Sequence, residues 1–158
     1  MGVQAASLYA HVQSKEELLY LIVDRVADEF VTAIVPIAAD RGRPAAERLR
    51  AALHAHLDVV AANLPTATVY FHDWRSCDSV RRDAILHKRD DYEGAWRSII
   101  ADGVASGELG DCDPRVAARM WLSAANWFHT WYRPEGPLAP GAVADAFADL
   151  LLEGLISR

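Results

Sequence analysis

Apolar residues recur at helical spacing along most of this 158-residue chain. The clearest run places a leucine or valine at positions i, i+4, i+8, i+11 and i+15, namely Leu49, Leu53, Leu57, Val60 and Leu64. This is the period of one face of an α-helix, whereas a half-buried strand would alternate apolar and polar residues. No segment alternates in that way and no internal repeat is present. The pattern therefore predicts an all-α fold.

Prolines, glycines and capping residues divide the pattern into about seven helices. Ser14 followed by Glu17 is a capping-box pattern, so a long helix is expected to begin near Lys15, and Pro36 fits its end. The other expected helices cover residues 4–12, 49–64, a short segment from Pro65, a segment through 85–100 that "ASGELGDCDP" closes, residues 114–132 and residues 143–155. In the helix from Pro114, the predicted apolar face consists of Val116, Met120, Ala124, Trp127, Phe128 and Trp131.

The first of these helices belongs to the stretch "GVQAASLYAHVQSKEELL", residues 2–19. Periodicity alone indicates only two packed helices. The residues themselves resemble the end of the DNA-binding domain of TetR-family transcriptional regulators, where a recognition helix precedes a connecting helix. The resemblance places base and phosphate contacts at Ala5, Ala6, Ser7, Tyr9, His11 and Lys15. Hydroxyl, imidazole and ammonium groups can donate to phosphate oxygens, and small side chains allow close approach to base edges.

The same resemblance implies three parts of the chain. Residues 1–14 correspond to a truncated helix-turn-helix, residues 15–36 to the connecting helix, and residues 37–158 to a ligand-binding and dimerisation domain. Family members carry two further helices before the recognition helix, and the first helix of the motif supports the second in the DNA groove. We therefore expect weak or no specific DNA binding by the 158 residues alone, and operator binding when the motif is complete.

Three later segments, "RDDYEGAWRSIIADGVASGEL", "AANWFHTWYRPEGPLAP" and "FADLLLEGL", resemble the ligand-binding domain of TetR-type regulators of fatty-acid and steroid degradation. This resemblance implies a ligand-responsive repressor that senses an apolar small molecule, plausibly an acyl-coenzyme A thioester. It also implies a homodimer in which residues 114–133 and 141–156 of two copies form a four-helix bundle.

Aromatic residues concentrate in the middle of the chain and are candidates for the walls of a ligand pocket. Ordinary core packing is the alternative interpretation of the same residues. Arg89, in a locally basic region, is a candidate partner for the phosphates of coenzyme A, although a solvated charged face is also possible. Together with Asn126, which could hydrogen-bond a polar ligand group, the candidate ligand-binding residues are Tyr70, Phe71, Trp74, Arg89, Tyr92, Trp96, Trp121, Asn126, Trp127, Phe128 and Trp131.

Composition excludes several other classes of function. The formal net charge of −6 gives the chain no general attraction to nucleic acid. Cys77 and Cys112 suit two free thiols in a cytoplasmic protein, and no apolar run reaches membrane-spanning length. His54 and His56 lie on opposite sides of one helix and cannot share a metal ion. With no catalytic, metal or cofactor motif, we expect no enzyme. The alternative function is a helical ligand-binding or dimerisation module without DNA-binding activity.

Overall fold

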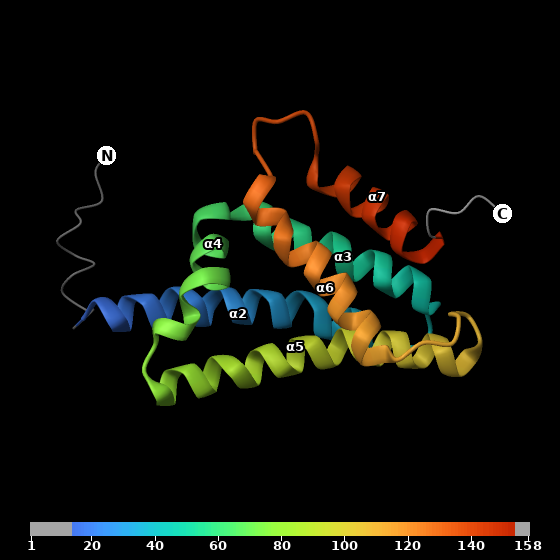
Figure 1. Cartoon of the computed structure of the whole chain (residues 1–158), viewed down its shortest axis with the longest axis horizontal. Coiled ribbons are helices and arrows are strands. Elements are labelled where there is room, and N and C mark those ends of the chain that lie inside the picture. Colours follow the sequence, from blue (N-terminus) through green and yellow to red (C-terminus); the bar gives the residue numbers. More distant parts are fainter. Residues whose placement is uncertain (1–13, 154–158) are drawn as a thin grey trace.

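The computed structural model describes residues 14–153, and within this range the chain is entirely helical (Figure 1). Its elements are α2 (Lys15–Ala39), α3 (Ala45–Ala62), α4 (Leu64–Asp73), the short 3-10 helix η1 (Trp74–Ser76), α5 (Ser79–Ser106), α6 (Pro114–Trp131) and α7 (Pro140–Glu153). The predicted all-α fold is confirmed. The expected helix over residues 4–12 lies outside the described residues.

The two longest helices, α2 and α5, pack along each other and form the base of the molecule (Figure 1). Helix α3 packs between α2 and α7, α4 contacts α2 near one end of the base, and α6 crosses α5. Because α4, η1 and α6 all lie over the α2–α5 pair, side chains from separate parts of the sequence converge above it.

Helix α2 begins as predicted and continues further than predicted. The Ser14 hydroxyl accepts a hydrogen bond from the backbone N–H of Glu17 at 3.1 Å, which is the expected N-cap. Pro36 was expected at the end of the helix, but it lies inside a helix that ends at Ala39. Proline cannot donate to the carbonyl of Thr32, one turn earlier. Both residues face solvent, so water can hydrate that carbonyl and the helix continues.

The other helix ends follow the expected punctuation. Asp78 and Asp113 cap the N-termini of α5 and α6 through their carboxylates. Gly107 ends α5 with φ of 76°, a left-handed conformation that glycine adopts without steric cost. The run from Leu49 to Val60 is buried as predicted, but α3 ends at Ala62 and Leu64 already belongs to α4. The sequence thus indicated the helices correctly and misplaced one boundary here.

The predicted single apolar face of α6 is wrong. Phe128 is fully buried, whereas Val116, Met120, Trp127 and Trp131 are 64%, 49%, 64% and 38% exposed. The buried face instead consists of Ala118, Trp121, Leu122, Ala125, Phe128 and His129. Helix α6 therefore has two apolar faces: one is buried in the core, and the other is largely exposed, with Trp131 at its end contacting Phe128 and Phe147.

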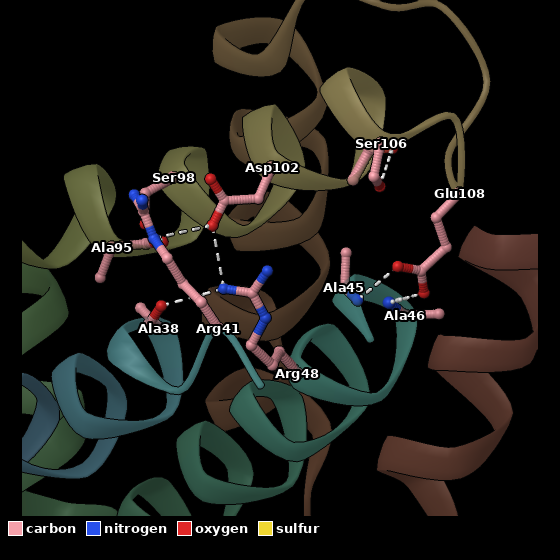
Figure 2. Close-up of polar contacts among 11 residues, drawn as sticks. Ala38, Arg41, Ala45, Ala46, Arg48, Ala95, Ser98, Asp102, Ser106 and Glu108 are labelled. Atoms are coloured by element: carbon pink, nitrogen blue, oxygen red, sulfur yellow. Dashed lines mark hydrogen bonds and ion pairs between the residues drawn. The ribbon is translucent and has the colours of Figure 1, made fainter. Parts of the chain in front are cut away.

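A buried arginine joins three helices at the end of the molecule where α2 turns into α3 (Figure 2). Arg48 is 3% exposed, and its Nη1 donates to the backbone carbonyl of Ala38 at 3.0 Å and to Asp102 on α5 at 3.1 Å. Beside it, the carboxylate of Glu108 accepts from the backbone N–H groups of Ala45 and Ala46 at 2.6 and 2.8 Å. These bonds satisfy orphan groups at the start of α3 and fix the end of α5 against it.

Replacing Arg48 by methionine should lower the free energy of unfolding by about 2–3 kcal/mol, because Asp102 and the Ala38 carbonyl then lose a charged hydrogen-bond donor. Arg25→Met is the matched control, since Arg25 forms only an exposed pair with Glu29 within α2 and should cost below about 0.5 kcal/mol. Urea unfolding of the two variants measures the difference. Equal losses would mean that the Arg48 bonds add no net stability.

Candidate functional site

A cavity of about 470 Å³ lies where α4, η1, α5 and α6 meet above α2 and α3. This volume falls within the roughly 300–1,000 Å³ typical of pockets for small organic ligands. The lining residues are Phe30, His56, Tyr70, Phe71, Trp74, Arg75, Leu86, Arg89, Asp90, Tyr92, Glu93, Arg119, Leu122, Ser123 and Asn126.

Aromatic rings form much of the wall. The ring of Phe30 on α2 lies 5.3 Å from Tyr70, 5.9 Å from Phe71 and 5.5 Å from Tyr92, measured between ring centroids. Such distances and tilted orientations are those of favourable aromatic pairs. Because one ring contacts side chains from α4 and α5 together, the wall is rigid and mainly apolar on this side.

A hydrogen-bonded pair lies at the buried end of the cavity. His56 is fully buried, and its Nδ1 is hydrogen-bonded to the hydroxyl of Tyr92. Burial lowers the pKa of His56 to about 3, with the Ala125 carbonyl opposing and the nearby His129 adding to this shift. Burial likewise raises the pKa of Tyr92 well above its usual value. Both groups are therefore uncharged at neutral pH.

The tautomer of His56 follows from its neighbours. Nδ1 is already occupied by Tyr92, and the Ala125 carbonyl, an acceptor, favours a hydrogen on the remaining nitrogen. Tyr92 then donates to Nδ1, and His56 carries its own N–H at Nε2. That nitrogen is buried, and the Ala125 carbonyl lies beside it without reaching hydrogen-bonding geometry, so Nε2 has no fully formed hydrogen bond within the described residues.

Arg89 places a cation in the same cavity. Its guanidinium lies 5.2 Å from the ring centroid of Tyr70 and 4.9 Å from that of Trp74, which are cation–π distances. Its Nη1 is buried without a hydrogen-bond partner, and no ion pair to Arg89 forms within residues 14–153. Burial raises the pKa of the Tyr70 hydroxyl, and the charge of Arg89 opposes that rise.

Charged residues of both signs surround the exposed side of the cavity. Arg75 lies over the Trp74 ring at 4.4 Å, and Arg119 pairs with Glu93 at 3.7 Å while its side chain stays 72% exposed. Asp90 is also exposed. The cavity thus passes from a buried end, with the uncharged His56–Tyr92 pair and the Arg89 guanidinium, to an exposed rim with two accessible guanidinium groups.

The structure brings together six of the candidate ligand residues and leaves five outside the cavity. Tyr70, Phe71, Trp74, Arg89, Tyr92 and Asn126 line it. Trp96, Trp121 and Phe128 are buried in the core, and Trp127 and Trp131 lie on the exposed face of α6. The cause is helical geometry, because α6 turns Leu122 and Asn126 toward the cavity and therefore turns Trp127 away. Trp127 does not form the wall that was expected of it.

Sequence reasoning missed Phe30, His56 and Leu122, among others. A signal for His56 was present, since it is a polar residue on the buried stripe that includes Leu53 and Leu57. The two histidines of α3 do diverge as expected: His54 contacts Asp145 on α7 at 2.7 Å.

The remaining sequence predictions concern DNA, cysteines and membranes. Ala5, Ala6, Ser7, Tyr9 and His11 lie outside the described residues, and Lys15 is the exposed first residue of α2; DNA contact stays a prediction for all six. Cys77 and Cys112 are free thiols, as predicted. Of the helices between residues 14 and 153, none combines the length and the apolar content that a membrane span needs.

Comparison with known proteins identifies the relatives of this chain. A sequence profile described as the C-terminal domain of tetracyclin repressor-like proteins matches residues 42–155. The HTH-type transcriptional repressor KstR2 of Rhodococcus jostii is 25% identical over 158 residues, covering 99% of this chain and 77% of KstR2. The solved TetR family transcriptional regulator PfmR of Thermus thermophilus aligns with a TM-score of 0.89 and 34% identity, covering 96% of this chain and 82% of PfmR. AibR, solved in complex with isovaleryl coenzyme A and operator DNA, aligns with a TM-score of 0.81 and 25% identity, covering 93% of this chain and 80% of AibR.

The buried imidazole predicts that acid destabilises the protein. The pKa of His56 is about 3 when folded and about 6.5 when unfolded, so between these values the unfolded chain binds a proton that the folded chain does not. The neutral, buried His56 contributes fully to the free energy of unfolding above pH 6.5, and this contribution falls as the pH drops. At pH 5 the free energy of unfolding should be about 2 kcal/mol lower than at neutral pH. Urea unfolding at pH 7.5 and pH 5 measures this loss, which should be smaller in His56→Gln. His54→Gln is the control, and a loss unchanged in His56→Gln would contradict the assignment.

Proposed function

This chain belongs to the TetR family of transcriptional regulators, and on that premise we propose that its repressor activity is controlled by a small molecule bound in the cavity between α4, α5 and α6. The observation that carries the proposal is the position of Phe30. It lies on α2, the helix that begins at Lys15, and its ring forms part of the cavity wall. One rigid helix therefore connects the cavity with the segment that resembles the DNA-reading motif.

The proposed ligand is an apolar acyl group carried as a coenzyme A thioester. The aromatic wall of the cavity suits an apolar group. The cavity volume of about 470 Å³ suits the acyl part of the ligand, and the nucleotide part would lie outside the cavity. Arg75 and Arg119 at the rim are accessible to phosphates. The isovaleryl coenzyme A complex of AibR, a structural neighbour, supports the same ligand class.

Ligand and operator would act on each other through α2. A ligand that binds one arrangement of the helices more tightly shifts the population toward it, and the shift is limited by this difference in affinity. Contact of the ligand with Phe30 would favour a different tilt of α2. The two DNA-binding motifs of a dimer would then be spaced differently. We propose Lys15, at the start of α2, as a phosphate contact of the operator complex.

The proposed homodimer uses the second apolar face of α6. Val116, Met120, Trp127 and Trp131 recur at i, i+4, i+11 and i+15 and are exposed, as is Leu150 on α7. Large apolar side chains exposed at helical spacing are typical of a protein interface, and a two-fold interface buries the same patch on both subunits. Phe147 and Leu151, which also belong to α7, are partly buried against the core of their own chain.

A titration with acyl-coenzyme A thioesters tests the sensor function. Binding to the native state should raise the melting temperature. In a version with a complete helix-turn-helix, binding should also release operator DNA that this version has selected from a random library. Leu122→Trp places a larger side chain in the cavity and should weaken binding at least tenfold, whereas Leu138→Trp, on the exposed loop before α7, should not. If no thioester changes either readout, the ligand class is wrong. Thioester binding without any operator binding would favour the ligand-binding module lacking DNA function.

Sedimentation tests the dimer. Met120→Glu and Leu150→Glu place a charge in the proposed interface, where burial without a partner is costly, and each should shift the protein toward monomer at micromolar concentration. Leu21→Glu is the matched control, because Leu21 is 48% exposed against 49% for both Met120 and Leu150 but lies on α2. A monomeric wild-type protein, or variants that sediment like the control, would remove this interface.

A further inference from the structure

The buried end of the cavity contains polar groups that the chain itself leaves unpaired. His56 Nε2, on α3, and Arg89 Nη1, on α5, are both buried, line the same cavity and have no hydrogen-bond partner within the described residues. Buried polar groups are normally paired, so each such group needs an explanation. Two of them in one cavity indicate a polar group of the ligand.

Both unpaired groups are donors. A guanidinium has only N–H donors, and the Ala125 carbonyl beside the ring favours the neutral His56 tautomer with its hydrogen on Nε2. The hydroxyl of Tyr92 gives its hydrogen to His56 Nδ1 and has none left for a ligand. The matching ligand group is therefore an acceptor, such as a carbonyl or carboxylate oxygen.

The position of Arg89 separates it from the arginines at the rim. Arg75 is exposed and the Arg119 side chain is 72% exposed, which suits phosphates that stay hydrated. Arg89 instead lies against the faces of Tyr70 and Trp74, and its Nη1 is shielded from solvent. Its neighbour Lys88 is paired with Asp24 and Asp28 at 2.6 and 2.7 Å, whereas Arg89 lacks such a carboxylate among the described residues. The sequence-based assignment of Arg89 to phosphates thus fits less well than contact with the enclosed part of the ligand.

We propose that His56 and Arg89, with Tyr92 holding the His56 ring through Nδ1, form a hydrogen-bonding subsite for an oxygen acceptor on the apolar part of the ligand. The cavity then selects acyl or ring compounds whose apolar part carries an oxygen acceptor over compounds of the same size whose apolar part is a plain hydrocarbon. This subsite rests on the proposed sensor function and specifies its ligand. A saturated ligand would displace water from His56 and Arg89 and leave their donors unpaired in a dry site, whereas an oxygen-bearing ligand satisfies them.

The test compares ligands of equal chain length by calorimetry and thermal shift. Hexanoyl-coenzyme A is the saturated reference, 3-oxohexanoyl- and 5-oxohexanoyl-coenzyme A carry a ketone, and adipoyl-coenzyme A carries a carboxylate. The best oxygenated ligand should bind roughly tenfold more tightly than the reference, the ratio expected for a hydrogen bond with a charged donor. The preferred member of the panel distinguishes an oxo group from a carboxylate as the natural acceptor.

Two variants assign the preference to the subsite. Tyr92→Phe and Arg89→Met should each reduce the affinity ratio of oxygenated to saturated ligand at least threefold. Tyr132→Phe is the matched control, because Tyr132 is equally buried, at 7% exposed, but does not line the cavity. Far-ultraviolet circular dichroism establishes that each variant is folded, and the wild-type ratio tests the subsite without any variant.

The outcomes separate the subsite from the sensor function. Equal affinity for saturated and oxygenated thioesters would overturn the subsite and leave the thioester sensor intact. A ratio that falls as much in Tyr132→Phe as in the other variants would also overturn it. Two thioester-free probes, 4-ethylcyclohexanone and ethylcyclohexane, complete the design. If the ketone stabilises the protein more than the hydrocarbon does and none of the thioesters binds, the subsite is supported and the thioester ligand is overturned. If no probe and no thioester stabilises the protein, both proposals are overturned.

Discussion

The ring of Phe30 is the contact on which the arrangement of the other helices depends. It is 1% exposed, and its centroid lies 4.7 Å from His56 on α3, 5.3 Å from Tyr70 on α4 and 5.5 Å from Tyr92 on α5. Aromatic rings are rigid, so one ring in contact with three helices fixes how closely these helices approach. The same ring is one of the residues that line the cavity. The cavity results from the same packing that stabilises the fold.

Two arginines, the buried Arg48 and the half-buried Arg89, are held in different ways. Arg48 reaches the carbonyl of Ala38 and the carboxylate of Asp102, and it fixes α2, α3 and α5 to one another (Figure 2). Arg89 has aromatic faces around it and an Nη1 without a partner. Arg48 also has a buried Nε without a partner, but its charge is paired with Asp102, whereas no carboxylate pairs with Arg89 among the described residues. This contrast is why we assign the Arg89 end, and not the Arg48 end, to ligand recognition.

The sequence predicted the elements of this fold better than their contacts. Leu49, Leu53, Leu57 and Val60 mark one buried stripe without ambiguity, and the glycine and aspartate caps mark the ends of α5. In contrast, Pro36 was a misleading stop signal, because the tolerance of a proline depends on solvent exposure that a sequence does not reveal. The candidate site was harder to predict, because a cavity depends on which faces of several helices meet. Helix α6 is apolar on two sides, so periodicity could not distinguish the side of Leu122 from that of Trp127. His56 was missed because its burial follows from α2, which is adjacent in space and distant in sequence.

The same helices that line the cavity also carry the surfaces proposed for regulation. On α6, Asn126 lines the cavity and the next residue, Trp127, belongs to the exposed face. On α3, His56 faces the cavity, while His54 contacts Asp145 on α7 and the pKa of that carboxyl is lowered by this hydrogen bond. Packed helices move as rigid bodies and not as isolated side chains. A ligand that displaced α3 or α6 would therefore also move the α6–α7 face, so that α2 is one of two routes from the cavity to the spacing of subunits. Which route dominates depends on the affinity difference that each arrangement of helices gives the ligand, and not on distance from the cavity.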